Sequence, residues 1–310
     1  MTNFTVYTFQ FGPIVPGPNS LPFPLEFDPD EVMTRKNEIF ETLFADLDAL
    51  EIYPDKESNV PLPIEAVHNK NIIMFYLGDP KTVTLIKKEG KRFLSKPDTT
   101  TPNCMVIIDN RHEEQRILIQ RKRDVFNGNT DKIAAMLQQS FNRKLSKEHL
   151  YMEIGHEYPP VVFWNYIKSQ PQGIKSIKLY IPFPNLPRVA EEIDKVDDVF
   201  EQMNSDYHSS MVIQIDAAEG GILTGLDEND PRLQYFLAAN AKCGKYALVK
   251  AAGRKSYYEC GKKDHMSQPL DDKIAKMTAN DFAGDIWADT YAYVGEQIKD
   301  PAAFAKIATK

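Results

Sequence analysis

Seven basic residues fall within the 22 residues Lys242–Lys263, against the single acid Glu259, which gives this stretch a net charge of +6. Cations neutralise backbone phosphates, and interleaved tyrosine rings can stack on unpaired bases. The pattern therefore predicts a surface that binds the backbone of DNA or RNA. The alternative is a solvated hairpin whose lysines protect a strand edge from aggregation. The candidate binding residues are Lys245, Tyr246, Lys250, Arg254, Lys255, Tyr257, Lys262 and Lys263.

A second basic cluster surrounds Arg121 and Arg123. Its other members are Arg116, Lys122, Lys132, Arg143, Lys144 and Lys147. We expect either a phosphate contact here or simply a charged exit from a strand. In the first case the two basic hairpins form two faces of one groove, or one face repeated in a dimer.

Asp109 and the sequence Gln120-Arg121-Lys122 offer a different chemistry. Each ends a predicted strand, and the spacing resembles the D…(E/D/Q)xK hairpin of restriction-endonuclease-like nucleases. In that family a carboxylate and a second oxygen ligand hold Mg²⁺, while the lysine supports the attacking water. Asp109, Gln120 and Lys122 are thus the alternative catalytic residues, with Glu89 as a third oxygen donor. The chain departs from that family in having Gln in place of the usual acid.

Other cofactor and metal signatures are missing from the sequence. Cys104, Cys243 and Cys260 show no CxxC spacing, and the histidines show no HxH or HExxH spacing. No glycine-rich loop is followed by GK[ST]. We therefore expect no cofactor, apart from Mg²⁺ under the nuclease alternative, and free thiols in a reducing cytoplasm.

Hairpins are the elements expected to position these residues. Met105–Asp109 and Arg116–Gln120 predict one hairpin, and Lys245–Lys250 and Lys255–Cys260 predict another, with Gly253 in its turn. A further strand is expected over residues 174–183, where polar and apolar residues alternate.

Apolar residues at steps of three and four predict the helices. They begin at Asp28 or Asp30, at Asn129 or Asp131, and after Pro160, and the last runs from Leu270 almost to the C-terminus. Two more helices are expected over Arg188–Met203 and Pro231–Ala241. Together these elements predict an α+β fold with a mixed or antiparallel sheet, hairpins and packed helices.

The whole chain has 310 residues, a formal charge of −7 and 42% hydrophobic residues, which excludes a disordered, collagen-like or coiled-coil chain. Acids concentrate in Glu26–Glu57 (net −8) and Ala190–Pro231 (net −11), so the remainder carries +12. We expect either two α+β regions, an N-terminal one over residues 1–185 and a C-terminal one over residues 186–310, or a single domain. With no signal peptide and no apolar run of about 18 residues, we expect a cytoplasmic protein that does not insert into membranes.

The segment Tyr257–Asp271 (YYECGKKDHMSQPLD) resembles a stretch near the C-terminus of RexA-type phage-exclusion proteins. The likeness covers about fifteen residues and the order of elements before them. It implies a cytoplasmic, non-enzymatic abortive-infection factor that forms homodimers, binds DNA with little sequence preference and acts with a membrane partner. Lys255, Lys262 and Lys263 would inherit the binding role.

Three functions therefore remain open. The first is a non-enzymatic protein that binds nucleic-acid backbone, and the second is the Mg²⁺-dependent nuclease. The third is a protein-interaction module that captures a partner through the acidic helix around Glu191–Glu201.

Overall fold

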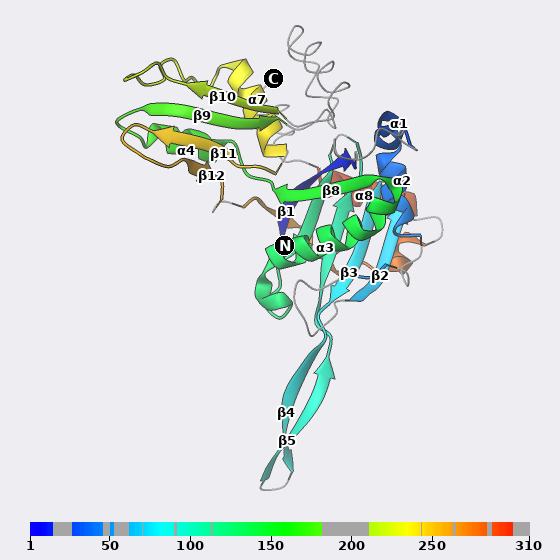
Figure 1. The fold of residues 1–310 in the computed structure, drawn as a ribbon. Helices are drawn as coiled ribbons and strands as arrows, with labels where there is room; N and C mark the ends of the chain where they lie inside the picture. Colours follow the sequence, from blue (N-terminus) through cyan, green and yellow to red (C-terminus); the bar gives the residue numbers. More distant parts are fainter. Residues whose placement is uncertain are drawn as a thin grey trace, which may run out of the picture.

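The computed structural model describes residues 1–14, 27–45, 50–52, 62–69, 71–89, 92–112, 114–181, 211–242, 244–262, 265–283 and 287–299. Within these residues the chain forms three antiparallel sheets, two of which are covered by helices (Figure 1). The predicted α+β class is confirmed, as are the two predicted hairpins.

A seven-stranded sheet forms the larger body, in the order β13-β1-β7-β6-β3-β2, with β8 also paired to β1. The long strand β1 (Thr2–Pro13) joins it together, because successive parts of β1 pair with β13, β7 and β8. The remaining strands are β2 (Leu62–Asn69), β3 (Ile72–Gly78), β6 (Asn103–Asp109), β7 (Arg116–Gln120), β8 (Leu150–His156) and β13 (Ser267–Leu270).

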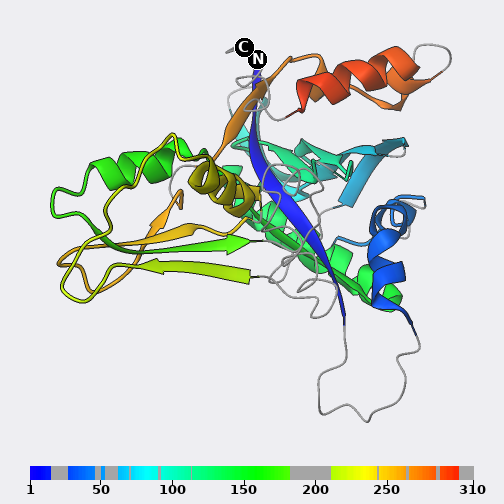
Figure 2. The same ribbon diagram turned by 90° about the horizontal axis from the view of Figure 1, so that it is seen from above.

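This sheet is buried on both faces, which explains why its central strands read as unbroken apolar runs in the sequence. Helices α1 (Pro29–Thr34), α2 (Lys36–Thr42) and α3 (Thr130–Leu145) lie over one face. Helix α8 (Trp287–Gln297) and two 3₁₀ turns, Ile274–Lys276 and Ala279–Phe282, cover the other. Figure 2 shows α8 (red) and the α1–α2 pair (blue) on opposite sides of the sheet.

The helix ends follow the sequence in part. Asn129 caps α3 as predicted, since its side chain accepts a hydrogen bond from the Lys132 backbone N–H at 3.0 Å. The helix predicted from Leu270 is wrong in its first half. Residues up to Leu270 are extended because they pair with β1, and Met277 is extended between the two 3₁₀ turns.

A smaller, four-stranded sheet has the order β10-β9-β11-β12. Helices α4 (Val161–Lys168) and α7 (Pro231–Lys242) pack on one of its faces and bury residues such as Ile177 and Val249. Its strands are β9 (Ile174–Ile181), β10 (Met211–Asp216), β11 (Ala247–Ala251) and β12 (Tyr258–Cys260).

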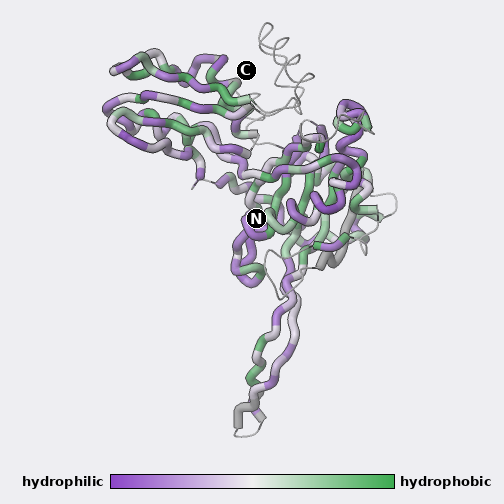
Figure 3. Tube along the Cα trace, in the orientation of Figure 1, coloured by the Kyte–Doolittle hydropathy of each residue, from purple (hydrophilic) through white to green (hydrophobic). Residues whose placement is uncertain are grey.

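Strands β4 (Lys81–Glu89) and β5 (Arg92–Thr100) form the third sheet, a two-stranded ribbon that projects from the larger body (Figure 1). We call it the arm. Leu85 and Ile86 lie along it with 38% and 68% of their surfaces exposed. Figure 3 shows apolar positions (green) along the arm. The sequence of residues 82–94 has no clear helical or strand period.

Both larger sheets contain strands from either side of residue 185. The four-stranded sheet takes β9 from one side of that boundary and β10, β11 and β12 from the other, while β13 returns to the larger sheet. The predicted acidic helix over Arg188–Met203 lies outside the described residues. Among the helices that the structure describes, none has the length and apolar character needed to cross a membrane.

Candidate functional site

The face of the four-stranded sheet that points away from α4 and α7 carries part of the predicted binding surface. Strand alternation places Lys178 on this face, because its neighbours Ile177 and Leu179 are buried against the helices. In the same way Lys250 lies on it, between the buried residues Val249 and Ala251. Lys178 was not selected from the sequence, although the alternation of β9 pointed to its exposure.

Tyr257 joins these two lysines. Its ring centroid lies 4.8 Å from Lys178 Nζ and 5.9 Å from Lys250 Nζ, and its hydroxyl lies 2.9 Å from Ser176 Oγ. Ammonium groups at such distances are attracted to the ring quadrupole, so the ring holds both cations near one place. We call Lys178, Lys250 and Tyr257 the lysine–tyrosine cluster.

Carboxylates share this face, and Asp216 lies nearest the lysine–tyrosine cluster. Asp216 accepts a hydrogen bond from Gln214 Nε2 at 2.6 Å. Hydrogen bonds from Ser176 and Gln214 lower the pKa of Asp216, and the nearby charges of Lys178 and Lys250 lower it further. The face therefore carries the two lysines together with two acids, Asp216 at the β10 edge and Glu259 on β12, and Glu259 is paired with Lys262.

The turn between β11 and β12 carries two more of the predicted cations. Gly253 has φ +76°, as the predicted turn requires, and Arg254 and Lys255 after it are exposed. Four of the predicted residues, Lys250, Arg254, Lys255 and Tyr257, thus lie on one hairpin, and two of them, Lys250 and Tyr257, are in contact.

The other predicted residues of this stretch are placed differently. Lys245 pairs with Glu153 of β8, and Lys262 pairs with Glu259. The Tyr246 ring lies 6.2 Å from the Tyr158 ring, and burial raises the pKa of its hydroxyl. These three residues lie where the two larger sheets meet. Lys263 falls outside the described residues.

Arg121 and Arg123 are exposed in the loop after β7, at the base of the arm. There Lys81 Nζ donates to the backbone oxygen of Asp124 at 2.7 Å. The two basic clusters therefore belong to different sheets, and the structure does not bring them together as two faces of one groove. Arg116 is not a surface cation, because it is buried with its Nε 2.8 Å from Glu157 Oε2.

The nuclease residues are not brought together either. In the β6–β7 hairpin Asp109 pairs with Arg116, which places it about 13 Å along β7 from Gln120. Asp109 is fully buried, 2.5 Å from Arg111 Nη2, and Gln120 Oε1 accepts a hydrogen bond from the Met105 backbone N–H at 3.0 Å. Lys122 lies beyond Gln120, at the far end of the hairpin from Asp109. This arrangement offers no common site for Mg²⁺.

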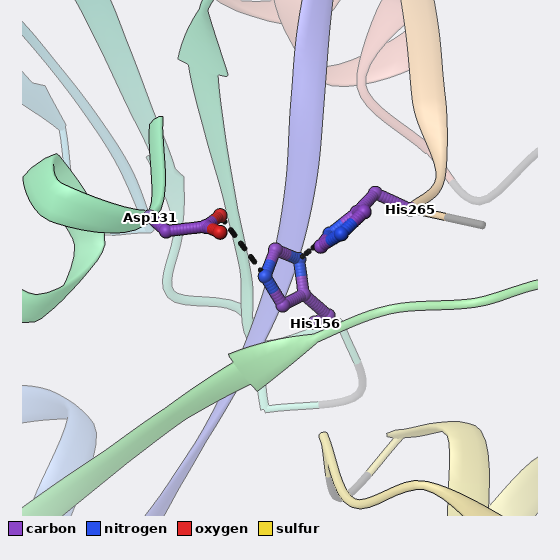
Figure 4. A group of neighbouring side chains, drawn as sticks. All are labelled: Asp131, His156 and His265. Carbon is purple, nitrogen blue, oxygen red and sulfur yellow. Dashed lines mark hydrogen bonds and ion pairs between the residues drawn. The ribbon is translucent and has the colours of Figure 1, made fainter. Parts of the chain in front are cut away.

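A cluster that the sequence did not predict lies between the sheets (Figure 4). His156 Nε2 lies 3.0 Å from Asp131 Oδ1, and its Nδ1 lies 2.6 Å from Nδ1 of His265. Burial, and after it the neighbouring His265, lower the pKa of His156 to about 4. The three residues are far apart in sequence, so no local spacing could reveal the cluster.

Beside this cluster a groove of about 650 Å³ runs between α3 and β8. The side chains of Asn142 and Gln138 on α3 bond to the backbone of β8, where Asn142 Oδ1 accepts from Met152 N at 2.6 Å and Gln138 Oε1 accepts from Ile154 N at 2.6 Å. Tyr7, Asp131 and His156 line the end of the groove nearest the cluster.

Comparison with known proteins gives no relative. No family model matches the chain, and no curated protein or solved structure matches it.

Proposed function

We propose that this protein binds the backbone of nucleic acid without cleaving it, through the open face of the four-stranded sheet. The observation that carries the proposal is the lysine–tyrosine cluster: two ammonium groups held around one tyrosine ring, on the face opposite the helices. Lysine side chains neutralise backbone phosphates and release the counterions bound to them. The aromatic ring contributes stacking that does not depend on base identity.

The neighbouring charges support the same function. Arg254 and Lys255 add two exposed cations at the end of the hairpin. By contrast, Lys245 and Lys262 already pair with carboxylates, so they contribute less to phosphate binding. Because the chain as a whole has a charge of −7, a local cationic face would also orient an approaching polyanion.

The arm supplies a second basic surface. Residues 81–100 contain six basic and two acidic residues, a net charge of +4, and Arg121 and Arg123 lie at its base. A two-stranded ribbon has dimensions that fit the major groove of duplex DNA. In this proposal the arm contacts duplex DNA, and the open face of the four-stranded sheet binds single-stranded nucleic acid.

The resemblance of Tyr257–Asp271 to RexA-type proteins suggests a setting for this activity. We propose that the protein acts in anti-phage defence in the cytoplasm. In this setting it self-associates and signals to a protein partner.

Fluorescence anisotropy with labelled single- and double-stranded DNA and RNA tests the proposal. Tyr257→Ala should weaken binding to single strands by about 1–3 kcal/mol, because the stacking surface is removed. Tyr257→Phe should bind nearly as well as the wild type, since it keeps the ring and gives up only the hydrogen bond with Ser176. No binding at low salt, or equal weakening in both variants, would sink the proposal, and label release that needs Mg²⁺ would replace it with the nuclease.

A further inference from the structure

The groups around His156 are suited to a metal ion rather than to an isolated hydrogen-bond chain. One ligand atom from each of Asp131, His156 and His265 lies within 4.8 Å of the others. The residues come from the first turn of α3, the end of β8 and the segment before β13. A carboxylate and two imidazoles from three separate elements form a donor set that Zn²⁺ takes in proteins.

We propose that Asp131, His156 and His265 bind one divalent transition-metal ion, with Zn²⁺ the best chemical match. The Nδ1 atoms of the two imidazoles face each other at 2.6 Å. Two nitrogens bound to one tetrahedral ion at about 2.1 Å lie about 3.4 Å apart, so the two rings must part by less than about 1 Å. Because Asp131 faces Nε2 of His156 while His265 faces Nδ1 of the same ring, a side chain of the cluster must also turn before all three donors reach one ion. Imidazole donors favour Zn²⁺ over Mg²⁺ or Ca²⁺, which prefer oxygen ligands.

The carboxylate is held in place by its neighbours. The hydroxyl of buried Tyr7 lies 2.7 Å from Asp131 Oδ1 and 2.9 Å from Thr130 Oγ1. Since a hydroxyl has one proton, Tyr7 donates it to the carboxylate and accepts from Thr130. Such outer hydrogen bonds orient a metal-binding carboxylate and typically change metal affinity about 10–100-fold.

The site has one open side. The Asp131 side chain is 61% exposed and that of His156 is 13% exposed. Both residues line the groove, so this side of the cluster is open to solvent. A water molecule or an anionic oxygen donor would complete a tetrahedral coordination sphere. The ion would also tie α3, β8 and the segment before β13 together.

Metal titration of the full-length, tag-free, chelator-treated protein tests the inference. Calorimetry with Zn²⁺ should give one ion per chain, and Co²⁺ should give the visible absorption of a tetrahedral complex. His265→Ala and His156→Ala should weaken Zn²⁺ binding about 100-fold or more, and Tyr7→Phe about tenfold. His112→Ala is the matched control, because His112 is exposed and lies outside the cluster.

Two results would overturn the inference: stoichiometric binding that survives in His265→Ala, or no binding by wild-type protein that has its native thermal transition. The inference is supported if His265→Ala binds Zn²⁺ more weakly while Tyr7→Phe and His112→Ala remain folded. Tyr7→Phe should then bind about tenfold more weakly than the wild type, and His112→Ala should bind as the wild type does. The inference does not depend on nucleic-acid binding, since the readout is the metal alone.

Discussion

At the scale of single residues, burial decides which charged side chains act and which only support the fold. Charged side chains are rarely fully buried, yet Asp109, Arg116 and Lys36 are all buried. Asp109 and Arg116 each meet an opposite charge, Arg111 and Glu157 respectively. Arg111 is only two residues from Asp109, whereas Glu157 lies 41 residues from Arg116. The burial of both pairs depends on the packing of distant segments, so the sequence could not separate these residues from candidates for catalysis.

Asp109→Ala should lower the free energy of unfolding by about 3–5 kcal/mol, because the guanidinium of Arg111 is left without its buried partner. Urea denaturation measures the change, and Asp98→Ala on the exposed arm is the control with a small effect. If Asp109→Ala instead kept wild-type stability and abolished a Mg²⁺-dependent cleavage, the structural role given to Asp109 would be wrong.

Lys36 predicts a distinct pH dependence. Burial lowers its pKa to about 8 in the folded protein. Between pH 8 and the ordinary lysine pKa of about 10.4, the unfolded chain therefore binds more protons, so the free energy of unfolding rises with pH through this group. Lys36→Met should be more stable than wild type at pH 7, by at most about 3 kcal/mol.

This advantage of Lys36→Met should shrink as the pH approaches 10, because the wild-type lysine is then neutral in the folded state and increasingly neutral in the unfolded chain. Chemical denaturation of both proteins at pH 7, 8.5 and 10 measures the difference. A difference that stays constant across this range would show that Lys36 is not desolvated as the structure indicates.

At the scale of elements, the sequence predicted the hairpins better than it predicted the arm. The β6–β7 and β11–β12 hairpins have apolar strands with a polar connection, and both form as expected. The arm has little apolar alternation because no core covers it, so residues 82–94 gave no clear period. The terminal helix was placed too early because pairing of β13 with β1 depends on residues about 265 positions apart.

Shortening the arm tests its role. Thr84 pairs with Pro97, so replacing Leu85–Lys96 by Asn-Gly closes the ribbon with a two-residue turn and removes five basic residues and one acid. The fold should persist, because Leu85 and Ile86 contribute no buried surface to the core. Affinity for duplex DNA should fall, and the slope of log K against log salt should become shallower by about 0.9 for each phosphate that the protein no longer neutralises.

Anisotropy and thermal unfolding of the shortened protein give the readouts for this change. Unchanged affinity and slope for duplex DNA would remove the arm from the binding surface. A fall in thermal stability would show instead that the arm supports the body.

At the scale of the whole molecule, the segment after β8 and the segment before β13 join the two larger sheets. The backbones of Gly155 in β8 and Gly244 before β11 approach so closely that a Cβ on either would overlap the other, which fixes the sheets against each other. The Asp131–His156–His265 cluster lies at this junction and the lysine–tyrosine cluster lies on the outer sheet. The basic hairpin could be predicted from local composition, whereas the junction needed interactions between residues more than 100 positions apart.

The salt dependence of nucleic-acid binding tests the central claim most directly. Dissociation constants for single-stranded DNA at several salt concentrations would be compared between wild type and Lys178→Gln/Lys250→Gln. The control is Lys168→Gln/Lys276→Gln, which removes the same charge from exposed positions elsewhere. We predict salt-sensitive binding by the wild type and the control, and a slope shallower by about 1.4 in the cluster variant, since two phosphates are no longer neutralised. Salt-independent binding, or equal slopes in all three proteins, would contradict the account.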